Sequence, residues 1–332
     1  MSFARFLKIF FALFFAVVLT LSAAGCQDRL ASTKEESATV LTIDGIEVPY
    51  EQLRYVVRNY MAVLGDGSFW TEEKAAELSE EVFRECFDIL KEQYAVVALA
   101  KEYGISKEDA GIKDRVDAYM ETVIADFGSE EAYLDALKAG NMTDAVYRFF
   151  LTVTVLEEEL FYAMQSAGAI ETDSAVLTAI VKGDEFVRVK HILISNDAGD
   201  VASENRQKAE EAHRRALAGE DFDALVTEFG EDLYMFENTD GYYLCRGLWY
   251  HAFEDAAFAL EVGEISDLIE TPAGYSILLR CEKEDTYIDS HLATLFEDYK
   301  ESRLALAIEE KVANITVETT KNFEKYTLLT ID

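Results

Sequence analysis

Proline and basic residues are scarce in this chain, and each shortage excludes a class of protein. Only Pro49 and Pro272 occur among the 332 residues, which excludes long proline-rich linkers between domains. The 30 Lys and Arg residues stand against 64 Asp and Glu residues, for a formal net charge of −34. Nucleic acid and anionic lipid both bind proteins through basic side chains, so we expect neither to bind this chain by charge. The acidic surface keeps the chain soluble, and attraction of cationic unfolded proteins is a second interpretation of it.

Cysteine is also rare, and its spacing fits neither a zinc site nor a CxxC motif. We therefore expect no metal and no other cofactor. Cys86 falls on the apolar stripe of a predicted helix, which is typical of a small core residue. Cys245 and Cys281 belong to segments that could face each other across a sheet, and the pattern leaves both a disulfide and free thiols open.

The N-terminus has the pattern of an export signal. Residues 1–25 contain two charges, Arg5 and Lys8, followed by an apolar run that is shorter than the roughly 20 residues of a membrane-spanning helix. Small residues then lead into Cys26, and this arrangement resembles the lipobox of bacterial lipoproteins, although Ala23 stands where leucine is usual. The resemblance implies a lipid such as palmitate on Cys26, at the extracytoplasmic face of the bacterial cell membrane. An ordinary cleaved signal and an uncleaved anchor are the alternatives, and both still export the chain.

A tether and a hairpin are predicted after this signal. Residues 26–39 are polar and show no apolar periodicity, as expected of a segment between a lipid and a fold. Residues 40–48 read as two short strands around Asp44-Gly45, which is a strong hairpin signal.

A helical region occupies the rest of the first half, so that residues 40–183 are predicted to form one N-terminal module. Apolar residues recur there at three- and four-residue steps, which is typical of amphipathic helices. Ser129 and Thr143 are predicted N-caps, and residues 106–109 resemble a capping box that opens a further helix.

The composition changes at Gly183, and a separate α+β domain is predicted over residues 186–284. It begins with a β-rich run, continues with helices, and has strand-like segments at 264–269 and 275–281. A helix capped by Ser290 is predicted over 290–312, followed by a strand at 315–317. We therefore expect residues 285–332 to pack on the N-terminal region, as one discontinuous helical module that is interrupted by the α+β domain.

Five segments of the α+β region resemble the parvulin-type peptidyl-prolyl isomerases, in the order found in that family. They are 189–194 (VKHILI), 218–222 (AGEDF), 246–260 (RG followed by AFEDAAFAL), 263–266 (GEIS) and 271–279 (TPAGYSILL). The resemblance implies an FKBP-like α+β fold. The wider arrangement is similar to the PrsA and SurA foldases, which surround a parvulin domain with a helical chaperone module, and residues 127–151 resemble their N-terminal region. Some members dimerise through this module, so a homodimer is left open.

The resemblance also implies a set of site residues. His191 matches the histidine of the first strand, and Asp232 matches the active-site Cys/Asp position. Thr271 falls where a hydroxyl often supports the family's histidine pair, although a threonine in such a place is more often an ordinary strand or turn residue. The apolar walls of the proline pocket correspond to Leu244, Trp249 and Phe253.

Two departures from the family pattern weaken the catalytic expectation. Ser276 stands where the last strand usually has histidine, and Ala273 replaces a larger or polar residue. Residues 238–242 (NTDGY) replace the usual Gly-Gly-Asp-Leu-Gly. A two-histidine network therefore cannot form, and Ser276 remains as a donor to Asp232 or His191.

Rotation about an Xaa-Pro bond has a barrier of about 20 kcal/mol and breaks no covalent bond, so the catalyst must favour a twisted amide. The first hypothesis is a weak isomerase for exported or unfolded proteins that contain Xaa-Pro bonds. The alternatives are a non-catalytic holdase chaperone and a lipoprotein with another binding role outside the cytoplasm. Both polar site residues also have a purely structural interpretation. His191 could be a buried histidine whose hydrogen bonds are made to backbone groups, and Asp232 could be an ordinary loop residue.

Overall fold

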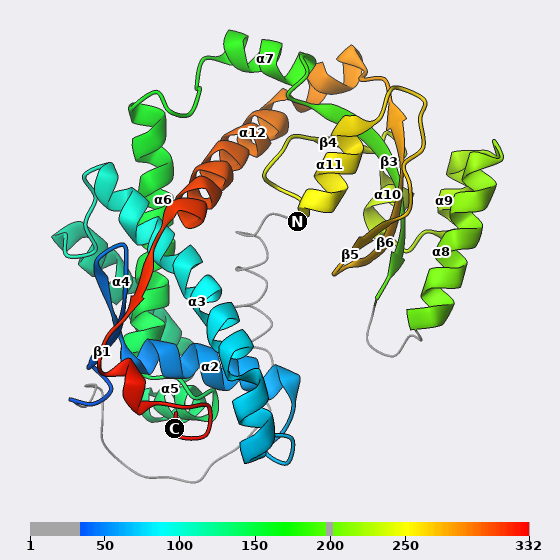
Figure 1. Cartoon of the computed structure of the whole chain (residues 1–332). Coiled ribbons are helices and arrows are strands. Elements are labelled where there is room, and N and C mark those ends of the chain that lie inside the picture. The colour runs from blue at the N-terminus through cyan, green and yellow to red at the C-terminus, as the bar shows by residue number, and fades with distance from the viewer. Residues whose placement is uncertain (1–33, 197–201, 332) are drawn as a thin grey trace. The chain divides into compact units, whose positions relative to one another are not determined.

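The computed structural model describes residues 34–196 and 202–331, which fall into two compact units (Figure 1). Residues 168–306 belong to one, which we call the α+β unit, and residues 34–167 and 307–331 belong to the other, the helical unit. Cys26 and the predicted signal lie outside the described residues. The predicted boundaries at 183 and 284 stay predictions, and the two units divide at 167/168 and 306/307. Within the described ranges, no helix has the length and apolar character needed to cross a membrane.

The helical unit contains a small sheet and a set of amphipathic helices. Its elements are β1 (Thr39–Ile43), β2 (Ile46–Pro49), α2 (Tyr50–Leu64), α3 (Glu72–Glu102), α4 (Ala110–Asp126), α5 (Glu130–Ala139), α6 (Asp144–Ser166), β7 (Val317–Thr319) and the 3-10 helix η1 (Phe323–Lys325). The last turns of α12 (Asp285–Asn314) also belong to it.

The sheet of the helical unit has the order β2-β1-β7 and joins the two ends of the described chain. Asp44 and Gly45 both have positive φ, at 53° and 73°, so the predicted hairpin between β1 and β2 is confirmed. The C-terminal strand β7 pairs antiparallel with β1, with Leu41 opposite Thr319. This strand lies two residues later than predicted. The pairing explains how segments far apart in the sequence form one discontinuous module.

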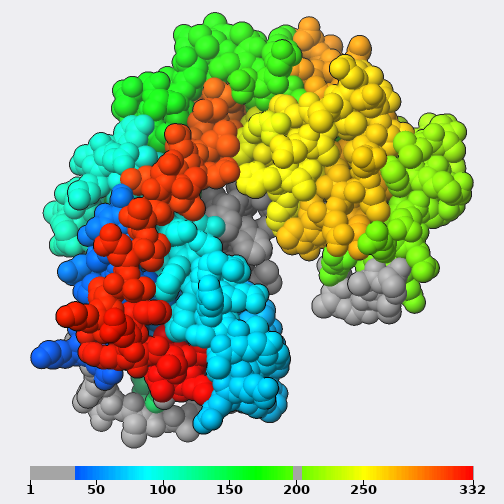
Figure 2. Space-filling model, in the orientation of Figure 1, coloured from blue at the N-terminus to red at the C-terminus, as the bar shows by residue number. Residues whose placement is uncertain are grey.

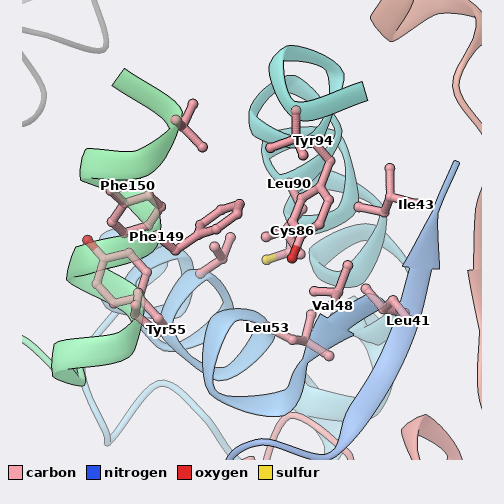
Figure 3. Close-up of a cluster of buried hydrophobic side chains, with 14 of the residues drawn as sticks. Leu41, Ile43, Val48, Leu53, Tyr55, Cys86, Leu90, Tyr94, Phe149 and Phe150 are labelled. Atoms are coloured by element: carbon pink, nitrogen blue, oxygen red, sulfur yellow. The ribbon is translucent and has the colours of Figure 1, made fainter. Parts of the chain in front are cut away.

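The core of the helical unit is built from apolar side chains of the sheet, α2, α3 and α6 (Figure 3). Leu41, Ile43 and Val48 from the strands face Leu90 and Tyr94 of α3. A further core residue, Cys86, is fully buried, as its place on the apolar stripe predicted.

The predicted caps at Ser129, Thr143 and Ser106 all form hydrogen bonds, although the one at Ser106 lies ahead of the helix that it precedes. Ser129 accepts a hydrogen bond from the Ala132 N–H at the start of α5, and Thr143 does the same at the start of α6. At 106–109 the Asp109 carboxylate accepts from the Ser106 N–H, as in a capping box, and the Ser106 hydroxyl accepts from the Glu108 N–H, one residue earlier than in an ideal box. The continuous helix α4 begins directly after this turn, at Ala110.

The α+β unit is a four-stranded antiparallel sheet with helices on both faces. Its elements are α7 (Ser174–Lys182), β3 (Val187–Ser195), α8 (Ala202–Leu217), α9 (Phe222–Phe229), α10 (Leu233–Glu237), β4 (Tyr242–Leu244), α11 (His251–Ala259), β5 (Ile269–Thr271), β6 (Gly274–Cys281) and the first part of α12. The strand order is β4-β3-β6-β5.

Side chains alternate in direction along the two central strands, β3 and β6, so each face of the sheet has its own apolar core. Ile192 and Ile194 of β3 pack with α8 and α9 on one face. Val187 and Val189 of β3 pack with Phe253 of α11 on the other. The odd-numbered residues of β3, His191 among them, therefore point towards α11.

Two expectations for this unit are corrected, and the open question of its cysteines is decided. The segment 264–269 forms only one β-bridge, because the Ser266 hydroxyl accepts from the Leu278 N–H and interrupts the backbone ladder; β5 begins at Ile269. The helix predicted from Ser290 begins at Asp285, and the Ser290 hydroxyl donates to the Thr286 carbonyl inside it. The three cysteines of the described ranges, among them Cys245 and Cys281, are free thiols.

Candidate functional site

Three predicted site residues meet on the α11 face of the sheet. His191 of β3 is 5% exposed. Its Nδ1 lies 3.1 Å from Asp232 Oδ2, and its Nε2 lies 2.9 Å from Ser276 Oγ. Ser276 reaches the ring from β6, where it pairs with Leu193, two residues along β3 from His191. The structure thus gives His191 two side-chain partners, unlike the alternative in which backbone groups satisfy it.

The partners of His191 fix the state of its ring. A carboxylate only accepts hydrogen bonds, so Nδ1 carries the proton and donates it to Asp232. In the tautomer with its proton on Nδ1 only, Nε2 is an acceptor, and the Ser276 hydroxyl donates to it. The result is a directed chain from Ser276 through His191 to Asp232.

Asp232 anchors this chain at the start of α10. Its Oδ1 accepts from the Tyr234 N–H at 3.0 Å, as an N-cap, so the side chain is held by the backbone. Its Oδ2 accepts from His191 and also from the Tyr242 hydroxyl, at 2.7 Å. Burial alone would raise the pKa of Asp232, but the hydrogen bonds from His191 and Tyr242 hold that pKa below its ordinary value. Asp232 is therefore ionised at neutral pH.

Tyr242 is a residue of the site that sequence reasoning missed. It is the first residue of β4 and the last of the NTDGY segment that departs from the family pattern. Burial, and then the hydrogen bond to Asp232, raise the pKa of its phenol, so it stays a donor. Its ring stacks on Tyr234 at 4.5 Å between centroids. A bulky aromatic in place of a glycine was the signal that could have identified it.

Aromatic rings form a wall beside the hydrogen-bonded chain. The Phe253 ring meets the His191 ring edge-on at 5.1 Å. Trp249 stacks on Phe253 at 4.9 Å, and Tyr242 meets Trp249 edge-on at 4.8 Å. The third predicted pocket residue, Leu244, is buried in the same cluster as Phe253. The three predicted substrate-binding residues therefore lie together on the face that carries His191.

Glu254 holds the loop that carries Trp249, and it too was missed. Its side chain is buried, and Oε1 accepts hydrogen bonds from the backbone N–H groups of Gly247, Leu248 and Trp249 at 2.7–2.9 Å. Three backbone donors compensate the cost of burying the carboxylate. Gly247 has φ of +94°, and a Cβ there would lie 3.1 Å from the Ser302 carbonyl. Loop geometry and the position of the Trp249 ring are thus set by one carboxylate.

Of the two interpretations of Thr271, the structure agrees with the strand or turn residue and not with a hydroxyl that supports His191. The Thr271 hydroxyl donates to the Gly274 carbonyl at 3.3 Å. The two residues close the tight connection between β5 and β6, where Gly274 has φ of +134°. Thr271 therefore stabilises a turn. In the described parts of the chain, no group of three or more His, Cys, Asp or Glu side chains is arranged to hold a metal ion.

Comparison with known proteins gives the same domain. The family model of the PPIC-type PPIase domain, a rotamase, matches residues 191–282. The foldase protein PrsA of Halalkalibacterium halodurans is 27% identical over 236 residues, which is 67% of each chain. PrsA of Bacillus subtilis is 28% identical over 142 residues, and this match covers 45% of its length. The crystal structure of PrsA from Streptococcus pneumoniae aligns with 87% of this chain and 99% of its own, at 20% identity and a TM-score of 0.35.

The matched range begins at His191 and ends just after β6, so it contains His191, Asp232, Ser276 and the aromatic wall. The PrsA matches extend beyond this range into the helical unit. Residues 191–282 therefore match a PPIC-type peptidyl-prolyl isomerase domain, and the chain as a whole is similar to the PrsA foldases.

Proposed function

We propose that this protein is a lipid-anchored folding factor outside the cytoplasm, which weakly catalyses cis/trans isomerisation of Xaa-Pro bonds in exported proteins. The observation that carries the proposal is the chain from Ser276 through His191 to Asp232 beside an aromatic wall. The polar groups and the apolar wall are the two features that a twisted prolyl amide requires.

The mechanism needs no covalent step. The barrier of about 20 kcal/mol arises from amide resonance, which is lost when the bond is twisted. Trp249 is partly exposed and offers apolar surface for the proline ring, and Phe253, which is 3% exposed, supports it from beneath. His191 and Ser276 supply hydrogen-bonding groups whose directions are fixed by Asp232, so little reorganisation is needed when the amide twists.

The proposed low rate follows from the size of Ser276. A serine hydroxyl satisfies His191 Nε2, but it cannot replace the shape and the second nitrogen of an imidazole. The Trp249 and Tyr242 rings also pack against each other beside His191, and they restrict the room for a substrate.

A protease-coupled assay on a tetrapeptide with an Xaa-Pro bond tests the catalytic part. We expect the wild type to accelerate isomerisation, and His191→Ala to lose at least about tenfold, or about 1.4 kcal/mol of transition-state stabilisation. Thr271→Val is the matched control, because Thr271 lies in the same sheet but bonds to a turn. A wild-type rate equal to the uncatalysed rate, with aggregation of an unfolded protein still suppressed, would favour the holdase alternative.

The lipid anchor has its own test. The proposal rests on the small residues before Cys26. Radiolabelled palmitate should be incorporated into the wild type and not into Cys26→Ser, and only the wild type should sediment with membranes. Cys86→Ser is the control, since that thiol is buried in the core. Equal labelling of Cys26→Ser would refute lipidation at this cysteine.

A further inference from the structure

An apolar groove lies on the helical unit, between α3 and the C-terminal tail. Figure 2 shows the tail (red) beside α3 (cyan). The groove has a volume of about 390 Å³ and is lined by Glu80, Phe83, Arg84, Phe87, Asp88, Lys91, Val317 and Phe323. Ligand pockets span roughly 300–1,000 Å³, so this one suits a few side chains and not a folded domain.

Three phenylalanines form the base of the groove. Phe323 of η1 meets Phe83 edge-on at 5.1 Å and Phe87 at 5.6 Å. Phe83 is buried, whereas Phe87 and Phe323 are only partly buried. An aromatic stripe on a helix is normally covered by another element, and open apolar surface of this kind marks binding sites.

In the part of the chain that the structure describes, one edge of β7 is unpaired, and Val317 of this strand lines the same groove. β7 is an edge strand, with β1 on its other side. The Thr316 carbonyl accepts from Asp44, and the Thr320 N–H donates to Val40, so the even-numbered residues bond to the sheet. Backbone groups alternate along a strand, and those of Val317 and Thr319 therefore face the open edge. An extended peptide could add to this edge by backbone hydrogen bonds.

The charge around the groove is strongly negative. Residues 72–92 of α3 contain eight Asp and Glu against three Lys and Arg, a surplus of five negative charges. The two cations of the groove are compensated within the helix, because Arg84 pairs with Glu85 and Lys91 pairs with Asp88. A bound segment with basic residues on both sides of its apolar part would complement this field.

We infer that this groove binds an extended, cationic segment of an unfolded polypeptide that carries a bulky apolar side chain. The segment adds to the open edge of β7, and its apolar side chain contacts Phe87 and Phe323. Its Lys or Arg residues face the acidic side chains of α3. No proline is needed, so this binding is separate from the proposed isomerase activity.

Fluorescence anisotropy with the purified full-length protein tests the inference. The probe is a labelled heptapeptide, Lys-Lys-Leu-Phe-Leu-Lys-Lys, which contains no proline. We expect it to bind more weakly as salt is added, since charge contributes. A peptide with Glu in place of Lys, and one with Ser and Gly in place of the apolar residues, should each bind at least about tenfold more weakly, the equivalent of 1.4 kcal/mol.

Variants locate the binding site. Phe323→Ala and Phe87→Ser should weaken binding about five- to tenfold or more, because truncation of a central aromatic contact commonly costs over 1 kcal/mol. Tyr162→Ala is the matched control, as it removes a 64%-exposed aromatic from α6 of the same unit. Glu80→Lys tests the charge without touching the aromatic base. Circular dichroism melting identifies any variant that fails to fold. If the two phenylalanine variants do not fold, Glu80→Lys still tests whether the peptide binds at this groove.

Each contrary outcome overturns the inference. Equal affinity of the wild type, Phe323→Ala and Glu80→Lys would place the peptide elsewhere. Equal binding of the acidic peptide would remove the charge argument. Absence of peptide binding, together with a dimer in sedimentation that Phe323→Ala abolishes, would make a second copy of this chain the occupant. His191→Ala should bind the peptide normally, so failure of the isomerase proposal would not affect this result.

Discussion

In the α+β unit, polar side chains are buried beside aromatic rings, whereas in the helical unit aromatic rings line an open groove. His191 and Ser276 are buried and hydrogen-bonded to each other, next to Phe253. Phe87 and Phe323 of the helical unit contact each other at the base of a surface groove. The difference separates two tasks: oriented polar groups suit chemistry on a bound amide, and exposed apolar surface suits binding without chemistry.

Among substitutions that should affect one unit and not the other, Glu254→Ala should have the largest effect. It leaves the backbone N–H groups of Gly247, Leu248 and Trp249 without their buried acceptor, and we expect a loss of about 3 kcal/mol or more in the unfolding free energy of the α+β unit. The chain has two tryptophans, Trp249 in this unit and Trp70 in the helical unit. Urea unfolding followed by fluorescence, in Trp70→Phe and Trp249→Phe backgrounds, reports the two units separately. Equal destabilisation of both would contradict independent units.

Asp232→Ala should have the next largest effect, and on catalysis. His191 loses the acceptor that orients its ring, so kcat/KM for a prolyl tetrapeptide should fall about 10- to 100-fold, or 1.4–2.8 kcal/mol. The variant also loses the N-cap of α10, at a cost of about 1 kcal/mol. Asp232→Asn is the control, because it retains a cap but not the charge. Unchanged kcat/KM in both variants would show that the polar chain is only structural.

Ser276→Ala should act more moderately. It removes the donor to His191 Nε2 and leaves a buried acceptor unsatisfied, which costs about 1–2 kcal/mol of stability. The loss should appear in Trp249 fluorescence and not in that of Trp70. Ser276→Thr keeps the hydroxyl and is the matched control. An unaltered urea midpoint in Ser276→Ala would mean that the bond contributes nothing to the fold.

Tyr242→Phe should have the smallest effect, about 1 kcal/mol, and it should depend on pH. Folding lowers the pKa of Asp232, so its ionised form stabilises the protein above about pH 4, and this contribution is lost as pH falls through the folded pKa. Without the hydrogen bond from Tyr242, the pKa of Asp232 in the folded protein rises towards its unfolded value. Ionised Asp232 then contributes less to the free energy of unfolding. Carboxyl carbon NMR titration of Asp232 measures the pKa directly. A pKa that equals the wild-type value would exclude the phenol as its cause.

Local features of this protein could be predicted from the sequence because they depend on neighbouring residues. Asp44-Gly45 gives the hairpin, since both residues tolerate positive φ. Ser129 and Thr143 cap helices through bonds to residues three positions away. The turn before α4 shows the limit of such rules, because the predicted bond from Ser106 to Asp109 forms but the continuous helix begins only at Ala110.

The candidate site could be predicted only where a known pattern guided the prediction. Resemblance to the parvulin family pointed to His191, Asp232 and Ser276, but not to which atoms would meet. Tyr242 and Glu254 were missed because their bonds depend on how β4 and the loop before α11 are placed. For Thr271 the sequence left a supporting hydroxyl and an ordinary strand or turn residue open, and the bond to the Gly274 carbonyl agrees with the second.

The sequence by itself determined the alternation of β3 that turns His191 towards α11, the apolar stripes of the helices and the acidic charge of α3. Only the tertiary structure decided that Asp232 and Ser276, 41 and 85 residues further along the chain, hold the two nitrogens of one imidazole. It also decided that Phe323 lies against α3, more than 200 residues away in the chain. The reason is that periodicity within one element fixes which face a side chain occupies, whereas sheet register and packing fix which faces meet.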